Sequence, residues 1–117
     1  MSTISFTTKG EPASKSNSRR LVPFGGKPRF IKSEKALNFV KSFQLQCPCL
    51  DKLIEEDVSV TMTIYYSTRR PDLDESVVLD AMQGFIYKND RQVKEKHIYW
   101  GLDKEEPRIE IEIKRRE

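Results

Sequence analysis

The chain has little of the chemistry on which many small enzymes depend. Its 117 residues include one histidine, His97, and two cysteines, Cys47 and Cys49, in a Cys-Pro-Cys sequence. Two thiols without a further cysteine or histidine cluster cannot supply the four ligands of an ordinary structural zinc site. A single histidine also leaves histidine-led nucleophilic catalysis little to work with. We therefore expect two reduced cysteines at the end of a helix, in a cytoplasmic protein.

Long hydrophobic runs are missing as well. No apolar stretch approaches the roughly 20 residues of a membrane span, and the residues from Met1 to Phe6 lack the charged and apolar regions of a secretory signal. We expect no membrane partner. The chain also has no Gly-x-x-x-x-Gly-Lys-Ser/Thr loop, the phosphate-binding sequence of many nucleoside triphosphatases. Its length predicts one domain over residues 1–117.

Charge is abundant and unevenly distributed. Residues 1–50 hold nine lysines and arginines against two acidic residues, which gives +7, whereas residues 51–117 sum to −4. A basic half beside an acidic half suits a metal-dependent enzyme that acts on a polyanion, although a solvated basic face without a partner is the alternative. The segment at about 10–20 is predicted to be a flexible basic loop. Its hydroxyls and cations suit phosphate oxygens.

Hydrophobic patterning predicts an α+β fold, in which two helices pack against a mixed sheet. Alternating residues predict strands over 4–8, 58–66, 93–100 and 108–114, and a hairpin with its turn at 25–28 joins two more short strands. Helical spacing predicts helices over 33–43 and 76–87, and Asn89 is the expected end of the second. We expect strand 58–66 to be central. The charges of the last strand favour a position at the sheet edge.

Four aspartates surround the second predicted helix. Asp72 and Asp74 precede it, Asp80 lies within it and Asp90 follows it. Asp72 and Asp74 point the same way in an extended chain and can share one cation, and their hard oxygens suit Mg²⁺ or Mn²⁺. Two such ions about 3.5–4 Å apart clamp the attacking and leaving oxygens of a phosphodiester. Helix capping by Asp74 is the alternative, and the positions of Asp80 and Asp90 favour metal binding.

These sequences resemble those of the RusA family of Holliday junction resolvases. The resemblance is most specific over residues 69–93 and extends over the whole chain, since length and element order fit. The segments that carry it are Asp72-Leu73-Asp74, Leu79-Asp80-Ala81 and Asn89-Asp90-Arg91-Gln92-Val93, together with Gly10-Glu11-Pro12 and Arg19-Arg20 near the N-terminus.

The resemblance implies a RusA-like fold and a homodimeric, Mg²⁺-dependent endonuclease that cuts four-way DNA junctions symmetrically. It places Asp72, Asp74 and Asp90 as metal ligands and matches Asp80 to an aspartate of the family helix. Three positions depart from the family pattern. Glu75 replaces an asparagine and offers a further ligand, and Asn89 replaces an aspartate. Val78 replaces a lysine that the family uses near the scissile phosphate.

Two further sets of residues follow from this comparison. We expect another cation to take the place of the family lysine, and Lys88 is the first candidate, ahead of Lys94 and Lys96, which alternation places on one face of their strand. The alternatives are that the metals suffice or that the loop with Arg19 and Arg20 supplies the cation. The cations expected to contact DNA are Lys15, Arg19, Arg20, Lys27, Arg69, Arg70, Lys94 and Lys96. The aromatic residues suit either contacts at the unstacked centre of a junction or a place in the core or a dimer interface, and they are Tyr65, Tyr66, Tyr87, Tyr99 and Trp100.

Two alternatives remain for the activity. A protein with the same fold could bind junctions or other branched DNA with weak or lost cleavage, a hypothesis based on Val78 and Asn89. A phosphodiesterase acting on flaps or small nucleotides is the other, and it explains the basic N-terminal half less well.

Overall fold

The order of elements follows the sequence prediction. The computed structural model describes residues 3–12, 19–24, 27–69, 71 and 73–116, with the backbone alone for 19–24 and 27–32. The elements in chain order are β1 (Thr3–Lys9), β2 (Arg19–Phe24), β3 (Lys27–Lys32), α1 (Glu34–Gln46), β4 (Val58–Tyr66), α2 (Ser76–Ala81), the 3-10 helix η2 (Asp90–Gln92), β5 (Val93–Leu102) and β6 (Arg108–Arg115). Four strands form a mixed sheet in the order β1-β6-β4-β5, which confirms the α+β fold.

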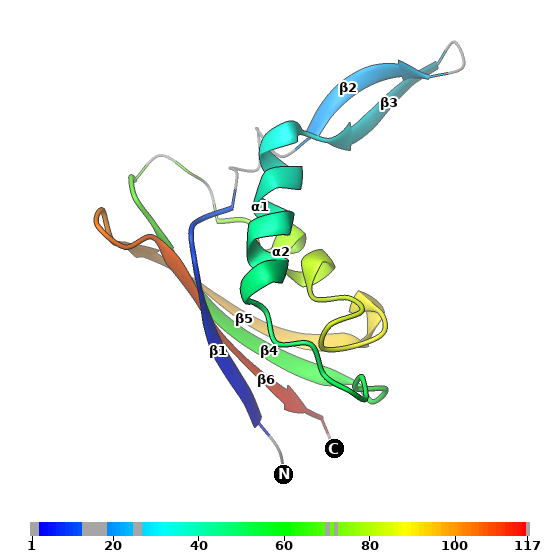
Figure 1. Cartoon of the computed structure of the whole chain (residues 1–117), viewed down its shortest axis with the longest axis vertical. Coiled ribbons are helices and arrows are strands. Elements are labelled where there is room, and N and C mark those ends of the chain that lie inside the picture. Colours follow the sequence, from blue (N-terminus) through cyan, green and yellow to red (C-terminus); the bar gives the residue numbers. More distant parts are fainter. Residues whose placement is uncertain (1–2, 13–18, 25–26, 70, 72, 117) are drawn as a thin grey trace.

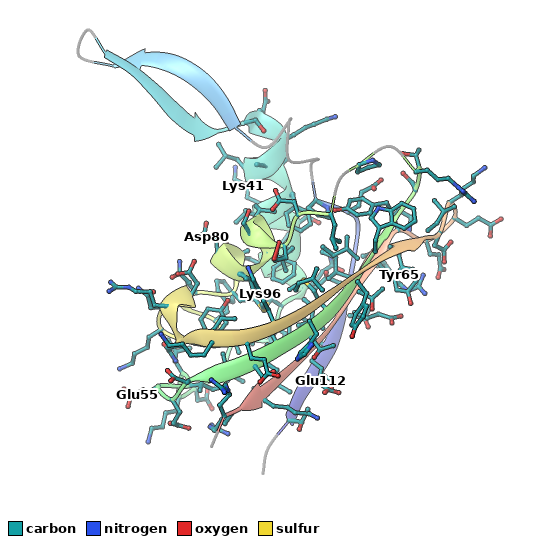
Figure 2. All side chains as sticks on the ribbon, turned by 180° about the vertical axis from the view of Figure 1, so that it is seen from behind. Lys41, Glu55, Tyr65, Asp80, Lys96 and Glu112 are labelled. Atoms are coloured by element: carbon teal, nitrogen blue, oxygen red, sulfur yellow. The ribbon has the colours of Figure 1, made fainter. Side chains whose placement is uncertain are left out.

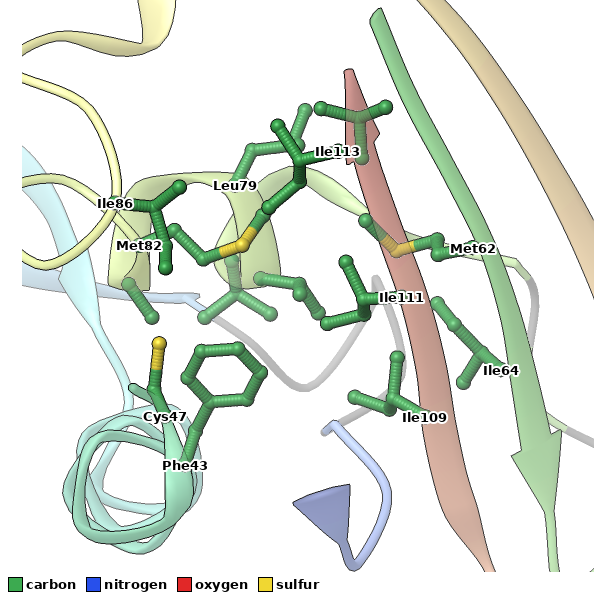
Figure 3. Close-up of a cluster of buried hydrophobic side chains, with 14 of the residues drawn as sticks. Phe43, Cys47, Met62, Ile64, Leu79, Met82, Ile86, Ile109, Ile111 and Ile113 are labelled. Carbon is green, nitrogen blue, oxygen red and sulfur yellow. The ribbon is translucent and has the colours of Figure 1, made fainter. Parts of the chain in front are cut away.

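The core lies between one face of this sheet and the two helices (Figure 1). Strand β4 alternates strictly between buried and half-buried residues, as a central strand covered on one side does. Its inward residues Met62 and Ile64 and the β6 residues Ile109, Ile111 and Ile113 meet side chains from both helices (Figure 3). No helix in the described part of the chain is both long and apolar enough to cross a bilayer.

The predicted edge position of the last strand was wrong. Strand β6 lies inside the sheet, antiparallel to both β1 and β4. Its charged residues Glu110 and Glu112 share the sheet face that no helix covers, where a shallow hollow is lined mainly by polar residues of β1, β4 and β6. Charged residues at alternate positions therefore indicate that one face of the sheet is open to solvent. Both interior strands and edge strands can have such a face.

The second helix is shorter than predicted. Helix α2 ends at Ala81, and the chain then turns at Gly84, whose φ is +83°. Glycine adopts this left-handed conformation without the strain that a Cβ brings, so it is a common helix terminator. The backbone beyond it pairs elsewhere, because Leu50 donates to the Phe85 carbonyl at 2.8 Å and Ile54 to the Ile86 carbonyl at 2.9 Å.

The first helix and its flanks agree with prediction. The Ser33 side chain caps α1 by accepting from the Ala36 amide, and Cys47 is the C-cap. Both cysteines are free, and burial raises the pKa of the Cys47 thiol to about 12.

Strands β2 and β3 form the predicted hairpin, which stands apart from the main sheet (Figure 1). Part of the segment predicted as a flexible loop is anchored: Gly10 donates to the Pro107 carbonyl at 2.8 Å and Pro12 is buried. Residues 13–18 of that segment lie outside the described residues.

Strand β5 contains a bulge that changes which way its residues face. Val58 of β4 pairs with Val93, but the next residue, Ser59, pairs with Glu95, so Lys94 is the extra residue. Beyond the bulge, Lys96 pairs with the buried Val60, on the side that faces the helices. The bulge interrupts the alternation from which Lys94 and Lys96 were assigned to one face, so their sharing of a face stays a prediction.

Candidate active site

Tyr66, the last residue of β4, supports the segment that carries the first aspartates. Its side chain is fully buried, and its hydroxyl accepts from the Asp74 amide at 3.3 Å. The Trp100 ring stacks on the Tyr66 ring with centroids 6.1 Å apart, and the Trp100 Nε1 donates to the Pro71 carbonyl at 3.2 Å. These contacts hold the approach to α2 against the end of the central strand.

Asp74 is a buried carboxylate held by neutral donors. It is 3% exposed, and its Oδ1 accepts from the Ser76 amide at 3.1 Å and from the Ser76 hydroxyl at 2.7 Å. No lysine or arginine of the described residues forms an ion pair with it. A buried negative charge is costly unless it is compensated, so this position favours a cation.

Two further acids lie near the same tyrosine. Burial raises the pKa of Tyr66 to about 12, and the negative charges of Asp74, Glu11 and Glu75 act in the same direction. Glu11 accepts from the Ser67 amide at 3.2 Å and also from the Ser67 hydroxyl. Sequence reasoning did not select Glu11 as a site residue. The available signal was its place in Gly10-Glu11-Pro12 directly after a strand.

Gln83 joins the other two aspartates. Its Nε2 donates to the Asp80 Oδ1 at 2.9 Å, and its Oε1 accepts from the Asp90 amide at 2.8 Å. Burial raises the pKa of the nearby Tyr87 hydroxyl, and the charges of Asp90 and Asp80 add to that effect. Gln83 lies within the predicted helix 76–87, and nothing in the sequence signals this bridging role.

Asn89 and Gln92 fix the turn in which Asp90 lies. The Asn89 side chain accepts from the Arg91 amide at 2.9 Å and caps the 3-10 helix. Gln92 accepts from the Lys88 and Asn89 amides and donates to the carbonyls of Ile54 and Glu56. The asparagine at position 89 thus has a structural role, and it does not mark the end of α2.

The lysines near the site have different partners. The Lys96 ammonium lies 2.9 Å from the Glu75 carboxylate. The Lys88 ammonium pairs with Glu55, on the loop before β4. Lys94 and Arg69 are exposed.

Residues 9–114 match the family described as Endodeoxyribonuclease RusA. The chain belongs to this family. The sequence matches no individual curated protein. Membership makes the protein an enzyme of the endodeoxyribonuclease class, in a family that acts on Holliday junctions.

Several of the predicted site residues lie outside the described part of the structure. Asp72, Lys15 and Arg70 are outside the described residues, and only the backbone is described for Arg19, Arg20 and Lys27. Among the described residues no three acidic, histidine or cysteine side chains gather into one group. The donor chemistry nevertheless fits a hard cation, because Asp74, Asp80 and Asp90 offer carboxylate oxygens and Asp74 is buried without a cationic partner among those residues.

The aromatic residues differ in how far they are buried. Tyr66 and Tyr87 are fully buried in the core. Tyr65 packs on the other sheet face under the Arg108 guanidinium, 4.0 Å from the ring centroid. Tyr99 and Trp100 remain 55% and 39% exposed on β5, and contact between them and a junction stays a prediction.

Proposed function

We propose that this protein is a Mg²⁺-dependent endonuclease that resolves four-way DNA junctions by paired symmetric nicks, with Mn²⁺ as a possible substitute. Family membership supports the nuclease activity. The observation that supports metal dependence is the buried carboxylate of Asp74, which has neutral donors and no cationic partner among the described residues.

Each part of the proposed site has a separate task. Asp72, Asp74 and Asp90 would hold the metal, with Asp80 and Glu75 as further candidates, and the bound metal would polarise the scissile phosphate and lower the pKa of attacking water. Tyr66 and Trp100 position the Asp74 segment. Gln83 positions Asp90 relative to Asp80.

We further propose that two copies act together. A symmetric junction has two equivalent strands to cut, and a dimer with two-fold symmetry presents two identical sites to them. The DNA would lie against the basic residues of the N-terminal half and those beside the site, which are Lys15, Arg19, Arg20, Lys27, Arg69, Arg70, Lys94 and Lys96. A DNA substrate and two free cysteines accord with the predicted cytoplasmic location, which stays a prediction.

One assay distinguishes this function from its alternatives. Labelled four-way junction, linear duplex and flap DNA are incubated with the protein, with Mg²⁺ in one set and EDTA in the other. Paired nicks in the junction that require Mg²⁺ are the expected result. Junction binding with no product would indicate a branched-DNA-binding protein that has lost cleavage, the alternative suggested by Val78 and Asn89. Product from flaps alone would indicate a different phosphodiesterase.

A further inference from the structure

The helix beside the aspartates carries no cation. Helix α2 has the sequence Ser-Val-Val-Leu-Asp-Ala, and Val78 within it is fully buried. Cleavage of a phosphodiester accumulates negative charge on the phosphate oxygens, and a fixed positive charge that meets those oxygens accelerates the reaction. A side-chain cation that adds to the charge of the proposed metal would therefore have to come from another element.

Lys96 has an unusual place for a lysine. Its backbone pairs with Val60, whose side chain is fully buried, so Lys96 occupies a position that faces the helices. The next residue on that side, Ile98, pairs with Met62 and packs against the core. A charged side chain on this face needs a route to a polar partner. Figure 2 shows Lys96 between β5 and α2, on the same side of the sheet as Asp80.

The partner of Lys96 belongs to the aspartate segment. Its Nζ lies 2.9 Å from an oxygen of Glu75, the residue directly after Asp74. The two side chains are 51% and 21% exposed, so the ammonium is held from one side and open to solvent on the other. Among the described residues this is the one ion pair that reaches the segment between Pro71 and Glu75.

Stability alone gives little reason for this pair. Ion pairs that remain accessible to solvent contribute little to stability. A lysine facing inward on an edge strand also discourages strand-to-strand aggregation, but that purpose does not require a partner beside Asp74. The position instead suits a cation that meets an anionic ligand at the aspartates.

We propose that Lys96 is a catalytic residue whose ammonium contacts the non-bridging oxygens of the scissile phosphate, and that Glu75 is its positioning residue. This inference rests on the proposed nuclease function. In the reaction, a water oxygen attacks phosphorus and the bond from phosphorus to the leaving strand oxygen breaks. The leaving oxygen takes up a proton and the attacking water loses one to solvent. Lys96 keeps its proton throughout and stabilises the charge on the phosphate.

The geometry ranks Lys96 above the lysine that sequence position favoured. Lys88 is only two residues before Asp90, but its ammonium pairs with Glu55, and both side chains of that pair are more than half exposed. Figure 2 places Glu55 near the start of β4, away from Lys96 and α2.

The test is single-turnover cleavage of a labelled four-way junction by the wild type and by Lys96→Ala, Lys96→Met and Lys96→Arg. We expect the first two variants to lose roughly 10²-fold or more in rate, the scale of one lost transition-state donor. We expect Lys96→Arg to recover a substantial part of that loss, because the charge is restored. Lys114→Ala is the matched control, since Lys114 also pairs with a glutamate, at 3.3 Å on β6, and should cut normally.

The outcomes separate this inference from the nuclease proposal. If the wild type cuts the junction and Lys96→Met cuts it at the same rate, the role of Lys96 is overturned and the nuclease proposal stands. A loss that arginine does not relieve, accompanied by a lower melting temperature, would make Lys96 a structural residue and also overturn its role. A wild-type protein that cuts no DNA would remove both proposals together. A large loss in Lys88→Ala with normal Lys96 variants would assign the cation to Lys88 instead.

Discussion

At the scale of single residues, the surroundings of Asp74 suit both of the roles that the sequence presented as alternatives, helix capping and metal binding. One carboxylate oxygen accepts from the amide and hydroxyl of Ser76, as a residue that caps a helix does, although the formal cap position is Glu75. The Asp74 side chain is nevertheless buried, and no lysine or arginine of the described residues forms an ion pair with it. Capping and metal binding therefore need not exclude each other here.

This double role makes asparagine an informative substitution. Asp74→Asn keeps an oxygen that accepts from Ser76 but removes the negative charge. We expect cleavage to be abolished, while junction binding stays intact or becomes tighter, because a carboxylate that repels phosphate has been neutralised. We expect the same of Asp72→Asn and Asp90→Asn. The measurements are Mg²⁺-dependent cleavage, and junction affinity in EDTA.

Asp74→Ala serves as the comparison. It removes both the charge and the acceptor, so it should also lower the free energy of unfolding by about 1 kcal/mol, as the loss of a cap does. If any of the three asparagine variants cut at nearly the wild-type rate, that residue would not be a metal ligand.

At the scale of elements, hydrophobic patterns located the strands well, but they did not reveal where the backbone becomes irregular. Alternation located β1, β4 and β6 within one or two residues at each end, because one face of each is buried. The end of α2 was missed because Phe85 and Ile86 continue the helical spacing while their carbonyls accept from Leu50 and Ile54. The bulge at Lys94 was missed because nothing local marks it.

Gly84 offers a test of what ends α2. A Cβ at this position would meet no atom within 4 Å, so Gly84→Ala introduces no clash and only strains a backbone with φ of +83°. A left-handed conformation costs a residue with a side chain roughly 1–2 kcal/mol. We expect Gly84→Ala to lower the free energy of unfolding by that amount, measured by urea denaturation.

Gly101→Ala provides a contrasting variant. A Cβ there would lie 2.6 Å from the Tyr65 ring, so the effect of Gly101→Ala on stability arises from steric overlap on β5.

At position 84, asparagine tolerates the left-handed region better than alanine, so Gly84→Asn should recover part of the stability that Gly84→Ala loses. Equal stability of the Gly84 variants and the wild type would show that the backbone at this turn relaxes freely.

At the scale of the whole molecule, the uneven charge predicts salt-dependent DNA binding. The hairpin of β2 and β3 begins with Arg19 and Arg20 and stands apart from the main sheet (Figure 1). Replacing both arginines with alanine should weaken junction binding and reduce the slope of log K against log salt by about one to two units, one for each lost phosphate contact. Binding titrations at several salt concentrations measure this slope. An unchanged slope would place the DNA surface elsewhere.

The core also predicts a limit to stability at high pH. Burial raises the pKa of Cys47 and of Tyr66 to about 12, and the pKa of Tyr87 is raised as well. In the unfolded chain these groups ionise near their ordinary pKa values of about 8.5 and 10. Their contribution to stability is therefore complete below about pH 8.5 and is lost as the pH rises towards 12.

The measurement is the free energy of unfolding between pH 8 and pH 11, which we expect to fall continuously. Cys47→Ala removes the group that ionises first, so its stability should change less between pH 8 and pH 10, whatever its value at neutral pH. A wild-type stability that stays flat to pH 11 would contradict this account.

The place of β6 inside the sheet has a consequence for how the chain folds as it is synthesised. Strand β1 emerges first, but its sheet partner is β6, with Lys9 opposite Arg108 and Thr3 opposite Lys114. Strand β4 likewise gains its second neighbour only when β6 arrives. Pairing between such distant segments slows folding and leaves strand edges open to other chains in the meantime. The ribosome must therefore release β6 itself before this sheet can close.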